Sequence, residues 1–241
     1  MQPSTLPNGR PASPDTTAGE HYRVIRSQLV DMAAHMSPDQ AAAEVPALPG
    51  WSVQDTYAHI TGISADILAG VPGNPHDPGW TAGHLSTRRG HSLAEICEEW
   101  EANGPGVEAA LDDPARRRSV SAVLDAFHHG HDIRGALGRT EERHTPQAAF
   151  ATALTIKIRS GPWAEAGNPP IEFATGSGGW RLGAPDAAPV AALSTSDFEL
   201  SRLLIGRRSR AQMLAAGWSG DPEPIVDLLP AFGPPVTDLT E

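Results

Sequence analysis

The chain has 241 residues, with 18 lysines and arginines against 29 aspartates and glutamates, and a formal net charge of −11. Only Lys157 is a lysine, so no lysine-rich surface is available for a phosphate backbone, and nucleic acid is not an expected partner. A single cysteine, Cys97, excludes an intramolecular disulfide and favours a reducing compartment, so we expect a cytoplasmic protein. Neither an export signal nor a membrane-spanning run of apolar residues is expected, and a membrane partner is therefore not expected either.

The first third of the chain predicts an arm, two helices and a long connection. Residues 1–17 are polar, contain proline and lack periodicity, which predicts a disordered arm. Apolar residues then recur every three or four positions over residues 22–36, the pattern of an amphipathic helix that begins near Ala18. A second helix, capped by the Ser52 hydroxyl, should run to about residue 69. Prolines and glycines in residues 71–91 predict a long connection with room for a short helical turn.

Three more helices are predicted in the middle of the chain. They span about Ser92–Leu111, with a possible bend at the Gly-Pro-Gly of residues 104–106, then Ser119–Leu137, and then Thr145 to just before Gly161. Helices joined in this way predict an up-and-down bundle over residues 18–166.

After residue 166 the sequence pattern changes. Within residues 171–183, two short strand-like segments flank a glycine-rich turn, which predicts a hairpin. Residues 190–195 predict a third strand. Ser196 should cap a helix with apolar residues at helical spacing, followed by short helices near Ala211 and Ile225. Residues 167–241 are therefore predicted to form a small α/β domain.

The densest group of possible metal ligands lies in residues 125–132. At 100° per residue, Asp125, His129 and Asp132 fall within about 60° of one another on a helical wheel. An acid four residues before a histidine lets both side chains reach one cation, as in helical zinc sites. The same spacing is common on solvated helix faces with an internal salt bridge, so this helix alone leaves both interpretations open.

His59 lies beside the apolar positions of the second predicted helix, where a histidine is usually a packed residue. If the second and fourth predicted helices are neighbours, His59 can add a third ligand to Asp125 and His129. A fourth coordination position would then stay open, as catalytic metals require. Sequence spacing does not establish that the two helices are neighbours.

Three segments of the chain resemble the maleylpyruvate isomerase-like, mycothiol-dependent enzymes of the DinB-like superfamily. The segments are residues 49–59, 125–138 and 197–209, in the family's order, within a resemblance that covers most of residues 18–233. The resemblance implies a DinB-like four-helix up-and-down bundle followed by a small C-terminal α/β domain. This division matches the change of pattern near residue 166.

The resemblance also implies a bound divalent metal, commonly zinc. Its ligands in this chain would be His59, Asp125 and His129. The acid in this family is commonly glutamate, and Asp125 is one methylene shorter, which leaves its role less established than those of the histidines. His128 with Asp132 has the same four-residue spacing and is the alternative pair.

The second cofactor implied by the resemblance is a low-molecular-weight thiol, mycothiol. Its thiolate, stabilised by the metal, would attack a small electrophilic substrate. The residues expected to bind this cofactor are His59, Asp132 and Arg207. Cys97 lies in an ordinary helical context and is expected to be a small buried side chain, not the nucleophile.

Arg207 and Arg208 are the expected catalytic residues of the C-terminal segment. They follow Gly206 at the end of the predicted helix, where the resemblance implies an active-site arginine. A guanidinium can hold a carboxylate through two parallel hydrogen bonds. Charge complementarity at a helix C-terminus is an equally good explanation from the sequence alone.

These features predict a metal- and mycothiol-dependent transferase or isomerase that acts as a monomer or homodimer on a small electrophile. Two other functions fit the sequence. One is a non-catalytic small-molecule-binding or stress protein with the same bundle, and the other is a metal-dependent hydrolase whose open site activates water. Thiol dependence and metal retention distinguish the three.

Overall fold

The structure is a computed structural model that describes residues 16–241, apart from the side chains of residues 117–119. Most of the predicted disordered arm, residues 1–15, lies outside the described residues. Within the described residues, no helix combines the length and the apolar character needed to cross a bilayer.

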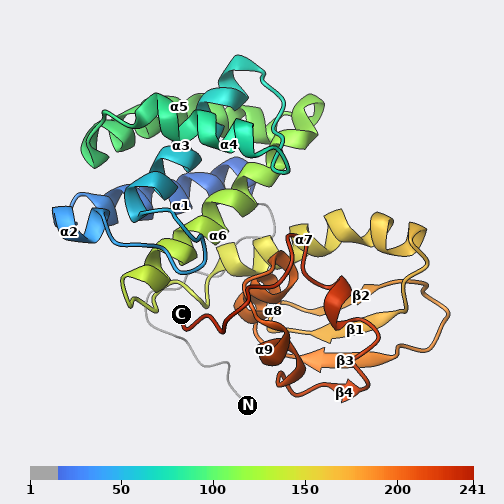
Figure 1. The fold of residues 1–241 in the computed structure, drawn as a ribbon. Coiled ribbons are helices and arrows are strands. Elements are labelled where there is room, and N and C mark those ends of the chain that lie inside the picture. Colours follow the sequence, from blue (N-terminus) through green and yellow to red (C-terminus); the bar gives the residue numbers. More distant parts are fainter. Residues whose placement is uncertain (1–15) are drawn as a thin grey trace, which may run out of the picture.

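Four helices form the bundle that the sequence predicts (Figure 1). They are α1 (Ala18–Ala33), α3 (Val53–Ala69), α5 (Leu93–Asp112) and α6 (Ser121–Ala136). Helices α1 and α3 each pack against both α5 and α6, around one hydrophobic core. At its centre the indole of Trp100 donates a hydrogen bond of 2.7 Å to the Tyr22 hydroxyl, so the buried indole N–H has a partner.

Capping residues explain where the bundle helices begin. The Ser52 hydroxyl accepts a hydrogen bond from the Asp55 amide, and the Asp55 carboxylate accepts one of 2.9 Å from the Ser52 amide. This is the capping box that the sequence predicts for α3. Thr17 with Glu20, and Ser92 with Glu95, start α1 and α5 in the same way. A short helix, α2 (Pro38–Ala41), lies between α1 and α3.

The long predicted connection contains more helix than the sequence suggests. Helix α4 (Pro78–Arg88) has 11 residues, begins after the Asp77 cap with proline at its first position, and packs on α3. Proline at the first turn of a helix costs no hydrogen bond, so this proline starts a helix instead of breaking one. Helix α5 likewise continues through Pro105, and a 3₁₀ segment, η1 (Pro114–Val120), leads on to α6.

Helix α7 (Pro146–Glu165) is longer than predicted and continues through Gly161 and Pro162. The reason is tertiary packing. Trp163 is almost fully buried in a second hydrophobic cluster, and its indole donates a hydrogen bond of 2.9 Å to the Pro169 carbonyl. Burial of an indole outweighs the local cost of proline in the last turn.

The C-terminal segment contains a four-stranded sheet in the order β2-β1-β3-β4. The strands are β1 (Ile171–Ala174), β2 (Gly179–Leu182), β3 (Ala191–Ser194) and β4 (Ser219–Gly220). Strands β1 and β2 form the predicted antiparallel hairpin, β3 is parallel to β1, and β4 was not predicted. Helices α8 (Asp197–Ile205) and α9 (Arg210–Leu214) and a 3₁₀ turn, η2 (Val226–Leu228), complete this part.

Helix α7 connects the two parts of the molecule (Figure 1). Its first half contributes Ala148, Ala151 and Leu154 to the bundle core, whereas Ile156 and Trp163 join the cluster under the sheet. The helical bundle and the smaller α/β part are thus confirmed. The predicted domain boundary near residue 166 lies just after α7. Because α7 contributes side chains to both hydrophobic clusters, this boundary stays a prediction.

Candidate metal centre

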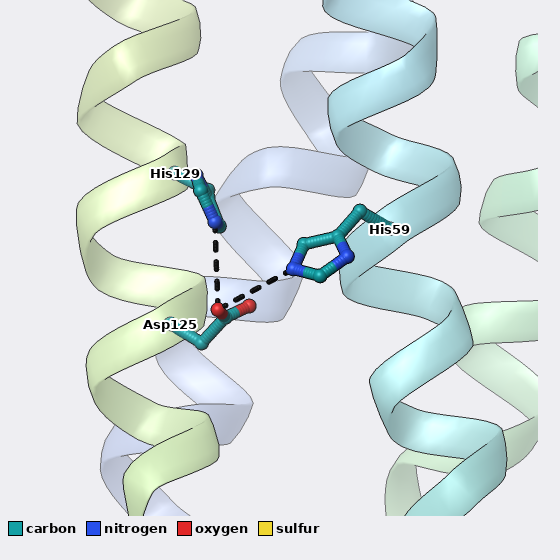
Figure 2. A group of neighbouring side chains, drawn as sticks. All are labelled: His59, Asp125 and His129. Carbon is teal, nitrogen blue, oxygen red and sulfur yellow. Dashed lines mark ion pairs between the residues drawn. The ribbon is translucent and has the colours of Figure 1, made fainter. Parts of the chain in front are cut away.

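Helices α3 and α6 bring together the three residues that the sequence singles out as metal ligands. Figure 2 shows Asp125 and His129 on α6 facing His59 on α3. Asp125 Oδ1 lies 3.4 Å from His129 Nε2 and 3.6 Å from His59 Nε2, and the three potential ligand atoms all lie within 4.8 Å of one another. The packing of α3 against α6, which the sequence did not establish, is what assembles the group.

The residues present fit a divalent cation. Ligand atoms at the usual zinc distances lie about 3.3–3.6 Å apart in a tetrahedral site, which is the spacing of Asp125 from the two histidines. These separations are longer than ordinary nitrogen–oxygen hydrogen bonds. The second carboxylate oxygen, Asp125 Oδ2, is buried and has no hydrogen-bond partner among the described residues, an arrangement that is costly for a carboxylate and that a bound cation would relieve.

Electrostatic coupling in the group is strong. Burial alone would raise the pKa of Asp125, but His129 and His59 hold it well below its usual range. Burial would also lower the pKa of His129, yet Asp125 and Asp132 raise it to about 9. Without a metal, the two carboxylates therefore favour a proton on His129, which a bound cation would displace.

Asp132 fixes the orientation of His129. Nδ1–H of His129 donates a hydrogen bond of 3.0 Å to Asp132 Oδ2, which leaves Nε2 directed at Asp125. The Asp132 side chain is fully buried and also accepts hydrogen bonds from Arg202 and Arg207. Its predicted contact with the cofactor stays a prediction, since the bonds observed are those of a residue that positions His129.

On the opposite side, His59 contacts a histidine that sequence reasoning missed. His84 of α4 places its Nδ1 3.1 Å from His59 Nδ1, and its Nε2 lies 3.0 Å from Asp66 Oδ2. Trp80, also on α4, donates a hydrogen bond of 2.6 Å from its indole to the same oxygen. Residues 71–91 were predicted to be a connection, so His84 and Trp80 had no helix to place them.

Arg202 is the second side chain near the candidate site that sequence reasoning missed. It is fully buried, donates a hydrogen bond of 2.6 Å to Asp132 and one of 3.0 Å to the His128 carbonyl, and forms an ion pair with Glu241. The available signal was a charged residue among Leu200, Leu203 and Leu204 of a helix that had to be buried. Arg202 thereby joins α8 to the part of α6 that carries His129.

The two arginines predicted to be catalytic have different surroundings. Arg207 donates two hydrogen bonds to Asp132, of 3.0 Å from Nε and 2.9 Å from Nη2. Since Asp132 also bonds His129, this carboxylate connects Arg207 to the candidate ligand. Arg208 instead pairs with Glu199 through two hydrogen bonds of 2.8 and 2.9 Å and also contacts Glu241. Contact of either arginine with substrate or cofactor stays a prediction.

The alternative pair of His128 and Asp132 does not assemble. The buried His128 ring faces α8, with Nε2 3.4 Å from the Ser201 hydroxyl, while Asp132 bonds His129 and the two arginines. Within the part of the chain that the structure describes, His59, Asp125 and His129 form the single group of three or more such ligands close enough to share an ion.

Cys97 is buried, as predicted, and lies on α5. Burial raises the pKa of its thiol to about 12, and Glu101 adds to the effect. A thiol with this pKa remains protonated at neutral pH and is a poor nucleophile.

The fold and the site define a helical-bundle protein with an attached four-stranded α/β part and a partly buried group of two histidines and one aspartate. Residues 22–143, which include all three of these side chains, match the family model described as the mycothiol maleylpyruvate isomerase N-terminal domain. The chain belongs to this family.

Comparison with solved structures supports the same fold across both parts of the chain. A mycothiol-dependent maleylpyruvate isomerase aligns with a TM-score of 0.52 over 79% of this chain and 88% of its own, at 12% identity. A point mutant of a mycothiol-dependent maleylpyruvate isomerase aligns with a TM-score of 0.55 over 78% and 88%, also at 12% identity. No curated protein matches the sequence significantly.

Proposed function

We propose that this chain is a cytoplasmic, metal-dependent enzyme that uses mycothiol to isomerise a small electrophilic substrate or to transfer sulfur to it. The observation that carries the proposal is the convergence of His59, Asp125 and His129 inside the family's domain. Maleylpyruvate, the substrate named for the similar solved structures, is the first compound to test. Zinc is the proposed metal because imidazole and carboxylate ligands suit it.

The three ligands would hold the cation through His59 Nε2, His129 Nε2 and the Asp125 carboxylate. A bound divalent metal supplies a positive charge that lowers the pKa of a neighbouring thiol, so that the nucleophilic thiolate forms at neutral pH. With two neutral imidazoles and one carboxylate, the protein neutralises only part of the metal's charge. The remaining positive charge favours an anionic thiolate over a neutral thiol.

Two tryptophans, Trp51 and Trp80, flank the histidines of the proposed site. The Trp51 ring lies 5.1 Å from the His59 ring and 6.3 Å from the His129 ring, and the Trp80 ring lies 5.8 Å from His59. Both tryptophans are partly exposed, so they are available to a small molecule that approaches the ligands. Apolar walls around a charged centre strengthen its electrostatic interactions.

Arg207 is our proposed binding residue for an anionic group of the substrate or cofactor, and its surroundings favour it over Arg208. Its Nε and Nη2 bond Asp132, while no hydrogen bond among the described residues occupies Nη1. A guanidinium held in this way can present its remaining N–H groups to a carboxylate without first having to be ordered.

The direct test combines metal-loaded protein, mycothiol and maleylpyruvate and follows the product by chromatography and mass spectrometry. Omission of the thiol and removal of the metal with a chelator should each abolish turnover. Hydrolysis that proceeds without thiol would instead support a metal-dependent hydrolase. Failure of the purified protein to retain any divalent metal would support a non-catalytic binding protein.

The cysteine of the chain should be dispensable. Cys97→Ser is expected to change thiol-dependent turnover by less than about twofold, because a buried thiol with a raised pKa supplies no thiolate. The assay uses wild-type and variant protein with matched metal content. Loss of turnover in a folded, metal-loaded Cys97→Ser protein would show that the nucleophile belongs to the chain.

Arg207→Lys should lower kcat/KM by about 30- to 1000-fold, the equivalent of about 2–4 kcal/mol. The reason is that an ammonium group cannot reproduce the two parallel hydrogen bonds proposed between the guanidinium and a carboxylate of the substrate or cofactor. Arg208→Lys is the matched variant, since Arg208 has a similar two-bond partner but no direct contact with Asp132. Metal content and the thermal midpoint serve as controls. Equal and near-normal efficiencies in both variants would remove the arginines from substrate binding.

A further inference from the structure

We propose that His84 and Asp66 position the metal ligand His59 through a carboxylate–histidine–histidine chain, and that this chain raises the metal affinity of the centre. The inference rests on the proposed metal centre. It assigns a role to helix α4, the element inserted between α3 and α5, and to Gly62 of α3.

The hydrogen-bond geometry admits one consistent arrangement of protons when a cation is bound. His59 directs Nε2 at Asp125, so a metal-ligating His59 is a neutral imidazole that carries its proton on Nδ1. That proton faces His84 Nδ1 at 3.1 Å, which must then accept it. Neutral His84 consequently carries its own proton on Nε2 and donates it to Asp66 Oδ2 at 3.0 Å. Every donor in the chain then has an acceptor.

This arrangement extends the usual support of a metal-bound histidine by one residue. A ligating imidazole commonly donates its second N–H to a carboxylate or carbonyl, which fixes the ring and makes it a better ligand. On α6 that partner is the carboxylate of Asp132, bonded directly to His129. On α3 the partner is His84, with the carboxylate of Asp66 one bond further away.

Asp66 is itself held in place. Its Oδ2 accepts the Trp80 indole N–H at 2.6 Å as well as the His84 proton. The Trp80 and His84 rings pack edge to face with their centres 4.6 Å apart. His84 is almost fully buried, and its carbonyl accepts a hydrogen bond from Arg88, which pairs with Glu99 of α5. Helix α4 is therefore tied to both α3 and α5 around this ring.

Gly62 supplies an independent observation. A Cβ at Gly62 would lie 2.4 Å from Cγ and 2.5 Å from Cδ2 of His84, so no other residue at this position leaves room for the ring. A glycine inside a helix is less favourable than alanine by about 1 kcal/mol. The close approach of His84 to α3, which the proposed positioning of His59 requires, explains why a glycine is present at this position despite that cost.

The test measures zinc affinity by competition with a chelator in the full-length protein. His84→Phe and Gly62→Ala should weaken zinc binding about 10- to 100-fold, the usual effect of losing a partner of a metal-bound histidine. Gly83→Ala is the matched control for Gly62→Ala, because this glycine lies beside His84 on α4 and its Cβ would meet open space. Gly83→Ala should leave the affinity unchanged.

Two further variants separate positioning from packing. An asparagine at residue 84 can place an amide oxygen near the position of Nδ1 and accept the His59 proton, whereas a glutamine can reach only the position of Nε2. His84→Asn should therefore retain more zinc affinity than His84→Gln, although both are smaller than histidine. The visible spectrum of the cobalt-substituted protein should shift in His84→Gln and Gly62→Ala, because the geometry around His59 has changed.

The outcomes distinguish this inference from the proposed function. Zinc binding by the wild type that His59→Ala abolishes, but that all His84 and Gly62 variants leave within about twofold, would overturn the positioning role alone. Absence of zinc binding in the wild type would overturn the metal centre and this inference together. If a variant misfolds, NMR of the zinc-loaded wild type with nitrogen-15-labelled histidine provides the test. A scalar coupling between the Nδ1 atoms of His59 and His84 is expected, and its absence would contradict the proposal.

Discussion

Replacing His59 or His129 with alanine should weaken metal binding by about 100- to 1000-fold. Structural zinc sites with four ligands bind with about 10–16 kcal/mol, so each ligand contributes about 2.5–4 kcal/mol on average. The two histidines come from different helices, and neither α3 nor α6 alone supplies more than two of the three ligands. Elemental analysis after dialysis and chelator competition would measure the loss.

Asp125→Asn tests the carboxylate separately, because the amide keeps the shape of the side chain and removes its charge. Metal affinity should fall by a similar factor, and the raised pKa of His129 should return toward its usual range because Asp125 is its main charged partner. His91→Ala, at an exposed histidine outside the group, is the control and should change nothing. Full metal retention in both His59→Ala and His129→Ala would refute the site, whereas retention in Asp125→Asn alone would remove only the carboxylate.

Local signals in the sequence were sufficient to predict the helical bundle. Ser52 with Asp55, for example, marks the start of α3 by a hydrogen-bond pattern that needs only four consecutive residues. The same holds for the pairing of Asp125 with His129, since both lie on one helix face. Their union with His59 depends on which helices are neighbours. That information came from the resemblance to a family, not from spacing.

Side chains that support the site were harder to predict because their partners are distant in the sequence. His84 contacts residues 18 and 25 positions away, on a helix hidden in a proline-rich segment. Arg202 is joined to Asp132 across 70 residues, and an arginine is not expected to be fully buried without a known partner. Local propensity and periodicity contain no information about such pairs.

We expect the buried Asp132 to contribute more than any other charged residue to the stability of the contact between α6 and the C-terminal segment. Its carboxylate accepts four hydrogen bonds, one from His129, one from Arg202 and two from Arg207. The two arginines together hold its pKa well below the usual range, although burial acts in the opposite direction. A carboxylate has enough lone pairs for these four bonds, whereas an amide has one oxygen and presents two N–H donors to arginines that also donate.

Asp132→Asn should therefore lower the free energy of unfolding by about 3–5 kcal/mol, the cost of leaving a buried charge without its partner. For a chain of this length, that loss corresponds to a fall in Tm of about 6–20 °C. Metal affinity should also fall about 10- to 100-fold, because His129 loses the acceptor that orients its ring. Denaturant unfolding, thermal unfolding and chelator competition would measure the three effects.

Glu199→Gln is the matched control for Asp132→Asn. Glu199 also accepts two hydrogen bonds from an arginine, Arg208, but its side chain is 43% exposed, so the pair is screened by water and should contribute about 0–1 kcal/mol. Its partner in both bonds is Arg208, not Asp132 or His129, so metal affinity should not change. If the two substitutions destabilise the protein equally, burial is not what makes the Asp132 network strong. If Asp132→Asn destabilises the protein but leaves metal affinity intact, Asp132 holds the two parts of the chain together without orienting His129.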